Sequence, residues 1–443
     1  MPAALWFATA LLPDGWADWV EVSLADGMIS AVAVGVAPGA GAERHGIGLP
    51  GLGNAHSHAF QRGFAGLAER GEVGGDFWSW RAAMYRFVDR LGPAEVEAIA
   101  AQAFVEMLEA GFTRVGEFHY LHHGPDGRPY ADPAEMAGRI AAAAGAAGIG
   151  LTLLAGYYVH GGFAAEPGHP RFVTDADGFA RIVQASRVAV AGLPGAVVGV
   201  APHSLRAVRP GELAAVLPLA EGGPVHIHVA EQTGEVEACL AWCGRRPVAL
   251  LLDTLPVDGR WCLVHATHVD AGERRRLAAS GAVVGLCPIT EANLGDGVFP
   301  AADYRGAIAV GTDSNVQIDA AGELRLLEYG QRLTARARGV LAPAGGSTGR
   351  SLFDAALAGG GQALGAQGGI AVGRPADLVS LRADHPGLLS READGLLDAW
   401  VFAGSGMVDR VWARGRLRVA DGRHVAGERV LRAYAAALRR VLA

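Results

Sequence analysis

Apolar residues in this chain gather in short runs that end in polar residues, and amphipathic segments separate the runs. Near-continuous hydrophobicity over a short stretch is typical of parallel strands buried on both faces. Helical patterns lie between most runs, for example in residues 93–110, 134–147, 177–191 and 271–279. Eight runs begin near Leu49, Thr113, Gly150, Ala196, Pro224, Trp261, Ala282 and Ala307. Eight strand-then-helix units predict an α/β fold, a closed (β/α)₈ TIM-like barrel.

The two ends of the chain follow a different pattern. Residues 5–36 and 401–423 alternate apolar and polar positions, with turn signals at Asp26-Gly27 and Asp421-Gly422. Alternation with short turns is typical of half-buried strands. We therefore expect a small β-sandwich domain built from residues 1–48 and 370–443, with the chain returning to it through residues 369–379. The barrel is expected over residues 49–369.

One stretch is long enough to raise the question of a membrane span. Residues 140–159 form an uncharged stretch, as long as the run of about 20 apolar residues that a bilayer requires. Its first half is alanine-rich, Gly148 and Gly150 interrupt it, and residues 151–159 fit a separate buried strand. We therefore expect no membrane span. We also expect no secretion signal, because no basic region followed by an apolar run opens the chain.

The amino-acid composition excludes several partners and reaction classes. Hydrophobic residues make up 51% of the chain, which is enough for a large core, and the net charge of −7 disfavours nucleic acid or an anionic membrane as a partner. All 38 basic residues are arginine, so a Schiff-base lysine, a phosphate-loop lysine and a lysine-derived bridge between two metals are excluded.

The four cysteines are too few for a disulfide framework in 443 residues, which favours a reducing cytoplasm. Cys239 and Cys243 have helical i, i+4 spacing, but no second pair completes a zinc site, so we interpret them as packing thiols.

Polar side chains with metal-ligand chemistry stand at the ends of several predicted strands. His56 and His58 lie two residues apart, so an extended backbone points both imidazoles to one face. His228 and Glu231 end the fifth run, His265 ends the sixth, and Asp313 follows the eighth. The carboxyl ends of barrel strands meet on one face, where chemistry gathers in this architecture. A single histidine there is more often a pocket residue and Asp313 could be a helix cap, but the combination predicts a metal site.

Together these residues resemble the mononuclear deaminase branch of the amidohydrolase superfamily, over nearly the whole chain. The resemblance implies one divalent metal ion, with Zn²⁺ expected, held by His56, His58, His228 and Asp313. It implies that Asp313 accepts the proton of the attacking water, Glu231 carries a proton to the departing nitrogen, and His265 stabilises the tetrahedral intermediate. His226 is assigned to packing, and His119, His122 and His123 to a loop, because they lack an acidic or cysteine partner.

Closer motifs resemble formiminoglutamate deiminases of histidine degradation. They are HSHAFQR (56–62), DFWSWR (76–81), GEFHYLHH (116–123), APHSLR (201–206) and TEANLGDG (290–297). The resemblance implies hydrolysis of the formimino C=N bond of N-formimino-L-glutamate to N-formyl-L-glutamate and ammonia. Two substrate carboxylates would be bound by Arg81, Arg206 and Tyr120, with Gln61 and His203 orienting the reacting group. One departure is Asn315, where this family more often has histidine.

Two other hypotheses stay open at this point. A related deaminase acting on guanine, cytosine, an adenosine-type nucleoside or imidazolonepropionate would share the metal chemistry, but it would call for aromatic stacking around a neutral ring rather than two arginines. A non-catalytic scaffold would keep the barrel but lose metal ligands, whereas this sequence keeps every expected ligand. We expect a small dicarboxylate substrate, no nucleic-acid or membrane partner, a cytoplasmic location and a homodimer.

Overall fold

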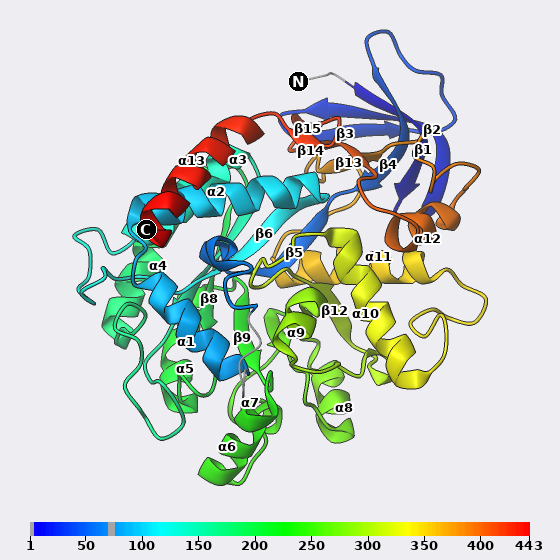
Figure 1. The fold of residues 1–443 in the computed structure, drawn as a ribbon. Helices are drawn as coiled ribbons and strands as arrows, with labels where there is room; N and C mark the ends of the chain where they lie inside the picture. Colours follow the sequence, from blue (N-terminus) through cyan, green and yellow to red (C-terminus); the bar gives the residue numbers. More distant parts are fainter. Residues whose placement is uncertain (1–3, 70–75) are drawn as a thin grey trace.

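The computed structural model describes residues 4–69 and 76–443 and contains two eight-stranded sheets (Figure 1). One sheet is parallel, with its strands in the order β12-β11-β10-β9-β8-β7-β6-β5. A parallel bridge between Ser57 and Asp313 joins its two outer strands. The strands are β5 (Leu52–Ser57), β6 (Phe112–His119), β7 (Gly150–Tyr157), β8 (Val197–Pro202), β9 (Val225–Val229), β10 (Trp261–His265), β11 (Val283–Leu286) and β12 (Ala307–Val310). The predicted eight-stranded barrel is confirmed.

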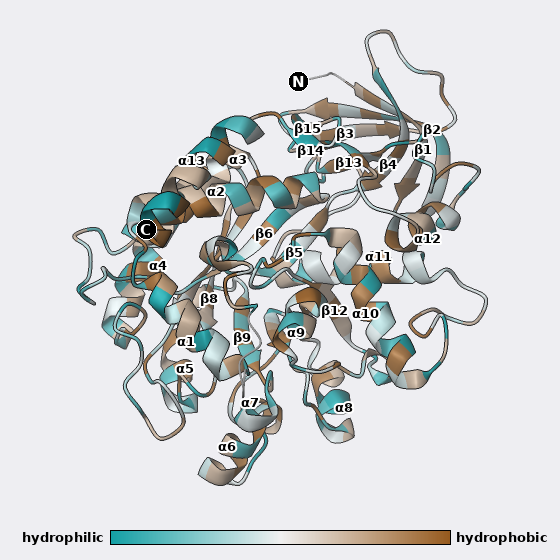
Figure 2. Cartoon of the chain, in the orientation of Figure 1, coloured by the Kyte–Doolittle hydropathy of each residue, from teal (hydrophilic) through white to brown (hydrophobic). Residues whose placement is uncertain are grey.

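Helices surround the barrel and connect its strands. Four were predicted within one or two residues: α2 (Pro93–Glu109), α3 (Glu135–Ala147), α4 (Ala176–Val190) and α8 (Ala271–Ser280). The side chain of Asp175 caps α4, and Asp270 forms a capping box with Glu273 at the start of α8. In Figure 2 the helices α2 and α13 carry both hydrophobic and hydrophilic residues, as expected for helices with one face on a core.

The remaining helices complete this layer and the site end of the barrel. They are η1 (Ala59–Phe64), α1 (Phe77–Val88), α5 (Pro210–Val216), η2 (Leu217–Ala220), α6 (Thr233–Cys243), α7 (Pro247–Thr254), α9 (Pro288–Leu294), η3 (Ala301–Asp303), α10 (Ala320–Ala335), α11 (Thr348–Ala363), α12 (Asp394–Phe402) and α13 (Gly427–Leu442). The C-terminal helix α13 lies along α2 (Figure 1). Within the described ranges, the longest apolar helical stretch still falls short of what a bilayer crossing needs.

The second sheet combines both ends of the chain, as predicted, in the order β16-β15-β14-β13-β4-β1-β2-β3. Leu5, Phe7, Val22 and Trp412 are fully buried in its own small core. Its strands are β1 (Ala4–Leu12), β2 (Gly15–Ala25), β3 (Met28–Ala33), β4 (Glu43–Pro50), β13 (Leu378–Leu381), β14 (Val408–Ala413), β15 (Arg416–Ala420) and β16 (Arg423–His424). Residues 1–3 of the predicted small domain lie outside the described residues.

The passage between the two sheets differs from the sequence-based expectation. The apolar run that begins at Leu49 is divided: Leu49 and Pro50 end β4 of the terminal sheet, and the barrel strand β5 begins at Leu52. Gly51 stands between them, and a Cβ atom there would collide with Thr113. Hydrophobicity alone could not locate this division because both strands are apolar. Val401, expected in a strand, lies in α12.

Candidate active site

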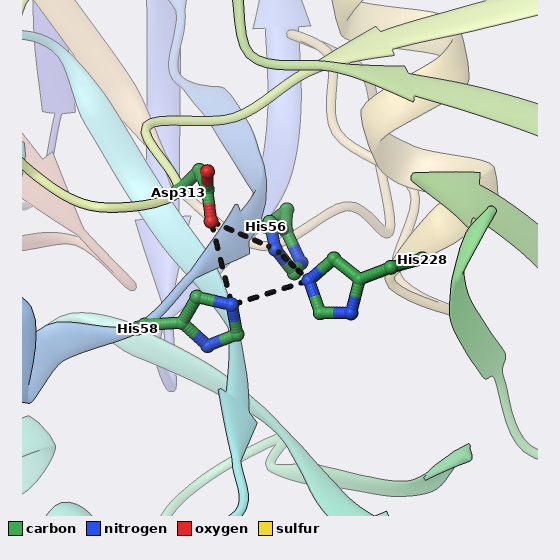
Figure 3. Close-up of side chains that lie close together, drawn as sticks. All are labelled: His56, His58, His228 and Asp313. Atoms are coloured by element: carbon green, nitrogen blue, oxygen red, sulfur yellow. Dashed lines mark hydrogen bonds and ion pairs between the residues drawn. The ribbon is translucent and has the colours of Figure 1, made fainter. Parts of the chain in front are cut away.

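Four side chains converge where the barrel strands end (Figure 3). His56 and His58 come from β5, His228 from β9, and Asp313 follows β12; one donor atom of each lies within 4.8 Å of all the others. The Nε2 atoms of His56 and His58 are 3.2 and 3.3 Å from Asp313 Oδ1, and His228 Nε2 is 3.0 and 3.2 Å from the same two nitrogens. All four residues are buried. This is the donor set of a mononuclear site with three nitrogens and one oxygen.

Backbone carbonyls fix the direction of two of these imidazoles. His58 Nδ1 lies 2.9 Å from the carbonyl oxygen of Phe118, and His228 Nδ1 lies 2.9 Å from that of His203. A carbonyl oxygen only accepts, so each Nδ1 donates its proton. Each Nε2 then directs a lone pair toward the common centre, as metal-binding histidines do.

Burial keeps the imidazoles neutral and available as ligands. Burial lowers the pKa of His56 to about 3, although Asp313 acts in the opposite direction, and it lowers the pKa of His228 well below its usual range. Burial alone would raise the pKa of Asp313, but hydrogen bonding to His56 and the nearby imidazoles hold it far below its usual range. Three neutral nitrogens and one carboxylate therefore fit a divalent cation.

Asn315 connects the first and last barrel strands beneath the site. Its amide donates to Ser57 Oγ and to the carbonyl oxygens of His58 and Asp313 at 3.0–3.1 Å, and its oxygen accepts from Thr312 Oγ1 at 2.6 Å. The side chain is fully buried. The departure noted in the sequence thus places an amide that holds the segments of His58 and Asp313 together, rather than a further imidazole.

Glu231 and His265 lie beside the four-residue cluster. His265 Nε2 is 3.8 Å from Glu231 Oε1, and His265 Nδ1 is 3.2 Å from Glu291 Oε1. Burial alone would lower the pKa of His265, but the bond to Glu291 and the charges of Glu231 and Asp313 raise it to about 10. The arrangement puts a buried carboxylate and a cationic hydrogen-bond donor next to the four-residue cluster.

The backbone at these strand ends adopts an uncommon conformation. His265, Ala266, Ala230 and Asp313 have φ values of 66°, 48°, 52° and 44°, in the left-handed region that non-glycine residues rarely adopt. Such residues cluster at functional sites, where the surrounding structure holds them in place. Here they lie at or beside the ends of β9, β10 and β12, next to the clustered side chains.

The five residues predicted to bind substrate line one cavity with the cluster. Gln61, Arg81, Tyr120, His203 and Arg206 share it with His58, His228, Glu231 and Asp313. Gln61 Nε2 donates to Tyr120 Oη at 3.1 Å. The structure therefore brings together every site residue named from the sequence. Their individual roles stay predictions.

The two arginines in this cavity have different partners. Arg206 lies 3.3 Å from Glu231 and 3.9 Å from Glu235, so carboxylates already neutralise it. Arg81 donates only to hydroxyl groups, from Nε to Tyr85 at 2.6 Å and from Nη2 to Tyr158 at 3.1 Å. Among the described residues, Arg81 has no carboxylate partner.

The sequence did not predict three residues that contact the site residues, namely Tyr85, Tyr158 and Glu291. Tyr85 follows Arg81 by one helical turn, which is a signal that could have been used. Tyr158 directly follows β7 and is far from Arg81 in the sequence, so only the fold shows their contact. Glu291 lies within the TEANLGDG motif, but nothing in the sequence pairs it with His265.

The histidines set aside in the sequence lie outside the cluster. His226 Nε2 is 2.8 Å from the carbonyl oxygen of Ala363, and His122 and His123 likewise contact carbonyl oxygens. His119 differs from its expected loop position because it is the last residue of β6.

Comparison with known proteins identifies the family. The amidohydrolase family profile matches residues 47–418. The chain belongs to the amidohydrolase family. The profile described as the N-terminal domain of formimidoylglutamate deiminase HutF matches residues 4–46.

Individual relatives agree with this membership. A formimidoylglutamate deiminase from Pseudomonas aeruginosa is 50% identical over 99% of this chain and 100% of its own length. A 5-methylthioadenosine/S-adenosylhomocysteine deaminase from Natronomonas pharaonis is 30% identical, over 77% of this chain and 74% of its own.

Solved structures show the same fold. An amidohydrolase from Brucella melitensis has a TM-score of 0.96 and 50% identity over 99% of this chain and 100% of its own. An adenosine deaminase from Xanthomonas campestris, solved with bound zinc, has a TM-score of 0.82 at 23% identity over 99% and 98%.

Proposed function

We propose that this chain is a formimidoylglutamate deiminase. It hydrolyses the C=N bond of N-formimino-L-glutamate, releases ammonia and N-formyl-L-glutamate, and acts in histidine degradation. The observation that carries the proposal is a single cavity that joins a three-histidine, one-aspartate cluster to two arginines. The 50% identity to the Pseudomonas aeruginosa deiminase over nearly the full length of both chains supports the same activity.

The cofactor we propose is one divalent metal ion, Zn²⁺, held by His56, His58, His228 and Asp313. The buried, neutral imidazoles with Nε2 atoms facing one centre support this assignment. When bound, such an ion lowers the pKa of water to about 7 and so makes hydroxide available near neutral pH.

The chain's own residues would then move the protons. Asp313 accepts the proton of the attacking water, and Glu231 carries a proton to the departing nitrogen. His265 donates from Nε2 and stabilises the attacking hydroxide and the tetrahedral intermediate. The 3.8 Å distance between His265 Nε2 and Glu231 Oε1 supports the proposal that both groups act at one reaction centre.

Arg81 and Arg206 would bind the two substrate carboxylates, with Tyr120 as a hydroxyl donor and Gln61 and His203 orienting the formimino group. Arg81 supports this because, among the described residues, its hydrogen bonds go to the hydroxyls of Tyr85 and Tyr158 and no carboxylate pairs with its charge. We expect Arg81→Lys to raise KM by about tenfold, since a lysine cannot replace a bidentate fork. Arg86→Lys on the exposed side of the same helix is the matched control. An unchanged KM in Arg81→Lys would remove Arg81 from substrate binding.

The direct test is ammonia release from N-formimino-L-glutamate compared with release from guanine, cytosine and adenosine. We expect turnover of the first compound alone. The resemblance to 5-methylthioadenosine/S-adenosylhomocysteine deaminases makes a nucleoside substrate the alternative, and activity only on the bases or nucleosides would establish it.

We propose a cytoplasmic location and a homodimer. Four cysteines that form no disulfide support a reducing compartment. Tyr329 and Leu333, one turn apart on α10, expose apolar side chains, and this shared face supports a contact with a second copy.

A further inference from the structure

His265 lies between two buried carboxylates, of which only one belongs to the proton-transfer scheme. Its Nε2 side faces Glu231, and its Nδ1 lies 3.2 Å from Glu291 Oε1. His265 is fully buried, and Glu231 and Glu291 are each 5% exposed. Within the described part of the chain, His265 Nε2 has no hydrogen-bond partner. Glu291 therefore holds one ring nitrogen, while the other lies on the side of Glu231 without a hydrogen bond.

Glu291 is itself held firmly. The backbone N–H of Cys287 donates to the same Oε1 atom at 2.9 Å, and the N–H of Glu291 donates to the carbonyl oxygen of Cys287 at 2.8 Å. These bonds form the first turn of α9, which directly follows β11. A carboxylate oxygen that already accepts from one N–H is a suitable acceptor for a second. Nδ1 of His265 is therefore the protonated nitrogen on that side of the ring.

On this geometry we propose that Glu291 is a positioning residue that acts through His265. It fixes the ring orientation and keeps the proton on Nδ1, so that Nε2 faces Glu231 and the reacting carbon. The proposal rests on the proposed deiminase function. Outer partners of this kind orient the groups that touch substrate, and their loss typically costs about 10- to 100-fold in activity.

A double-mutant cycle tests whether Glu291 acts through His265. We expect Glu291→Ala to lower kcat on N-formimino-L-glutamate about 10- to 100-fold with KM changed less than twofold. Glu291→Gln should retain more activity, because its amide oxygen can still accept from Nδ1. In a His265→Ala background, Glu291→Ala should cause no further loss. Multiplicative losses, or a wild-type kcat in Glu291→Ala, would refute the proposal. Asn293→Ala, exposed on the same helix, is the control.

A second readout does not depend on turnover. In protein labelled with ¹⁵N-histidine, the His265 signals are identified by their absence in His265→Gln. We expect a protonated Nδ1 in the wild type and loss of that protonated signal in Glu291→Ala, at unchanged metal content and melting temperature. A bare Nδ1 in the wild type would overturn the inference even in an active enzyme. A wild-type protein that releases no ammonia would overturn the proposed function and leave the NMR result to decide the role of Glu291.

Discussion

Two carboxylates at the site lie in different electrostatic surroundings and can therefore do different work. Burial raises the pKa of Glu231, whereas His56 and its neighbouring imidazoles hold the pKa of Asp313 far below its usual range. Asp313 therefore favours its ionised form, and Glu231 holds a proton more readily than an exposed glutamate does. The sequence predicted both residues. It could not predict the difference between their pKa values, because that difference depends on which groups the fold places around each carboxyl.

Replacing Glu231 by glutamine tests this division at the level of one residue. The variant keeps the shape of the side chain but cannot carry the proton, so we expect kcat to fall about 10²- to 10⁴-fold. Metal content, measured by elemental analysis, should stay unchanged because Glu231 is not a ligand. Glu237→Gln, exposed on α6, is the control. Near-normal turnover in Glu231→Gln would reassign the proton carrier.

At the level of elements, the contact between β5 and β12 holds the site together. The N–H groups of Thr312 and Asp313 donate to the carbonyl oxygen of His56 at 3.0 and 2.9 Å. Gly311 makes this approach possible, because a Cβ atom there would lie 2.7 Å from both the nitrogen and the oxygen of His56. The sequence predicts each strand from its apolar run, but it does not show that the first and last strands meet through a glycine.

Gly311→Ala should push β12 away from β5 and displace His56. We expect a loss of about 1–3 kcal/mol in the free energy of unfolding and weaker metal binding, measured by denaturant titration and by competition with a chelator. Gly234→Ala is the matched control, because a Cβ atom there meets nothing within 4 Å. If both variants bind metal equally well, the glycine contact does not support the site.

For the whole molecule, the sequence predicted the barrel, the terminal sheet and the gathering of site residues, because buried parallel strands leave a strong apolar signal. It did not predict where β4 gives way to β5, since both are apolar, or that Tyr85, Tyr158 and Glu291 surround the predicted site residues. Those contacts join segments that are distant in sequence, and no periodicity encodes them. The whole fold also determines how many histidines are buried in neutral form.

Buried neutral histidines predict a loss of stability in acid. Burial lowers the pKa of His226 to about 4, against 6.5 for the unfolded chain. Between these values the unfolded state binds the proton and the folded state does not, so stability falls as pH falls from about 6.5 to about 4. At pH 5 this one residue costs on the order of 2 kcal/mol. In urea titrations at pH 7.5 and pH 5, His226→Gln should lose less stability than the wild type. Equal losses would contradict the assignment.

The central claim is that one cation is held by donors from three separate strand ends. Anomalous diffraction from crystals of the metal-loaded protein tests it most directly. We predict one peak per chain, about 2.0–2.2 Å from Nε2 of His56, His58 and His228 and from an oxygen of Asp313. No peak at that position, or two peaks sharing these ligands, would contradict the account.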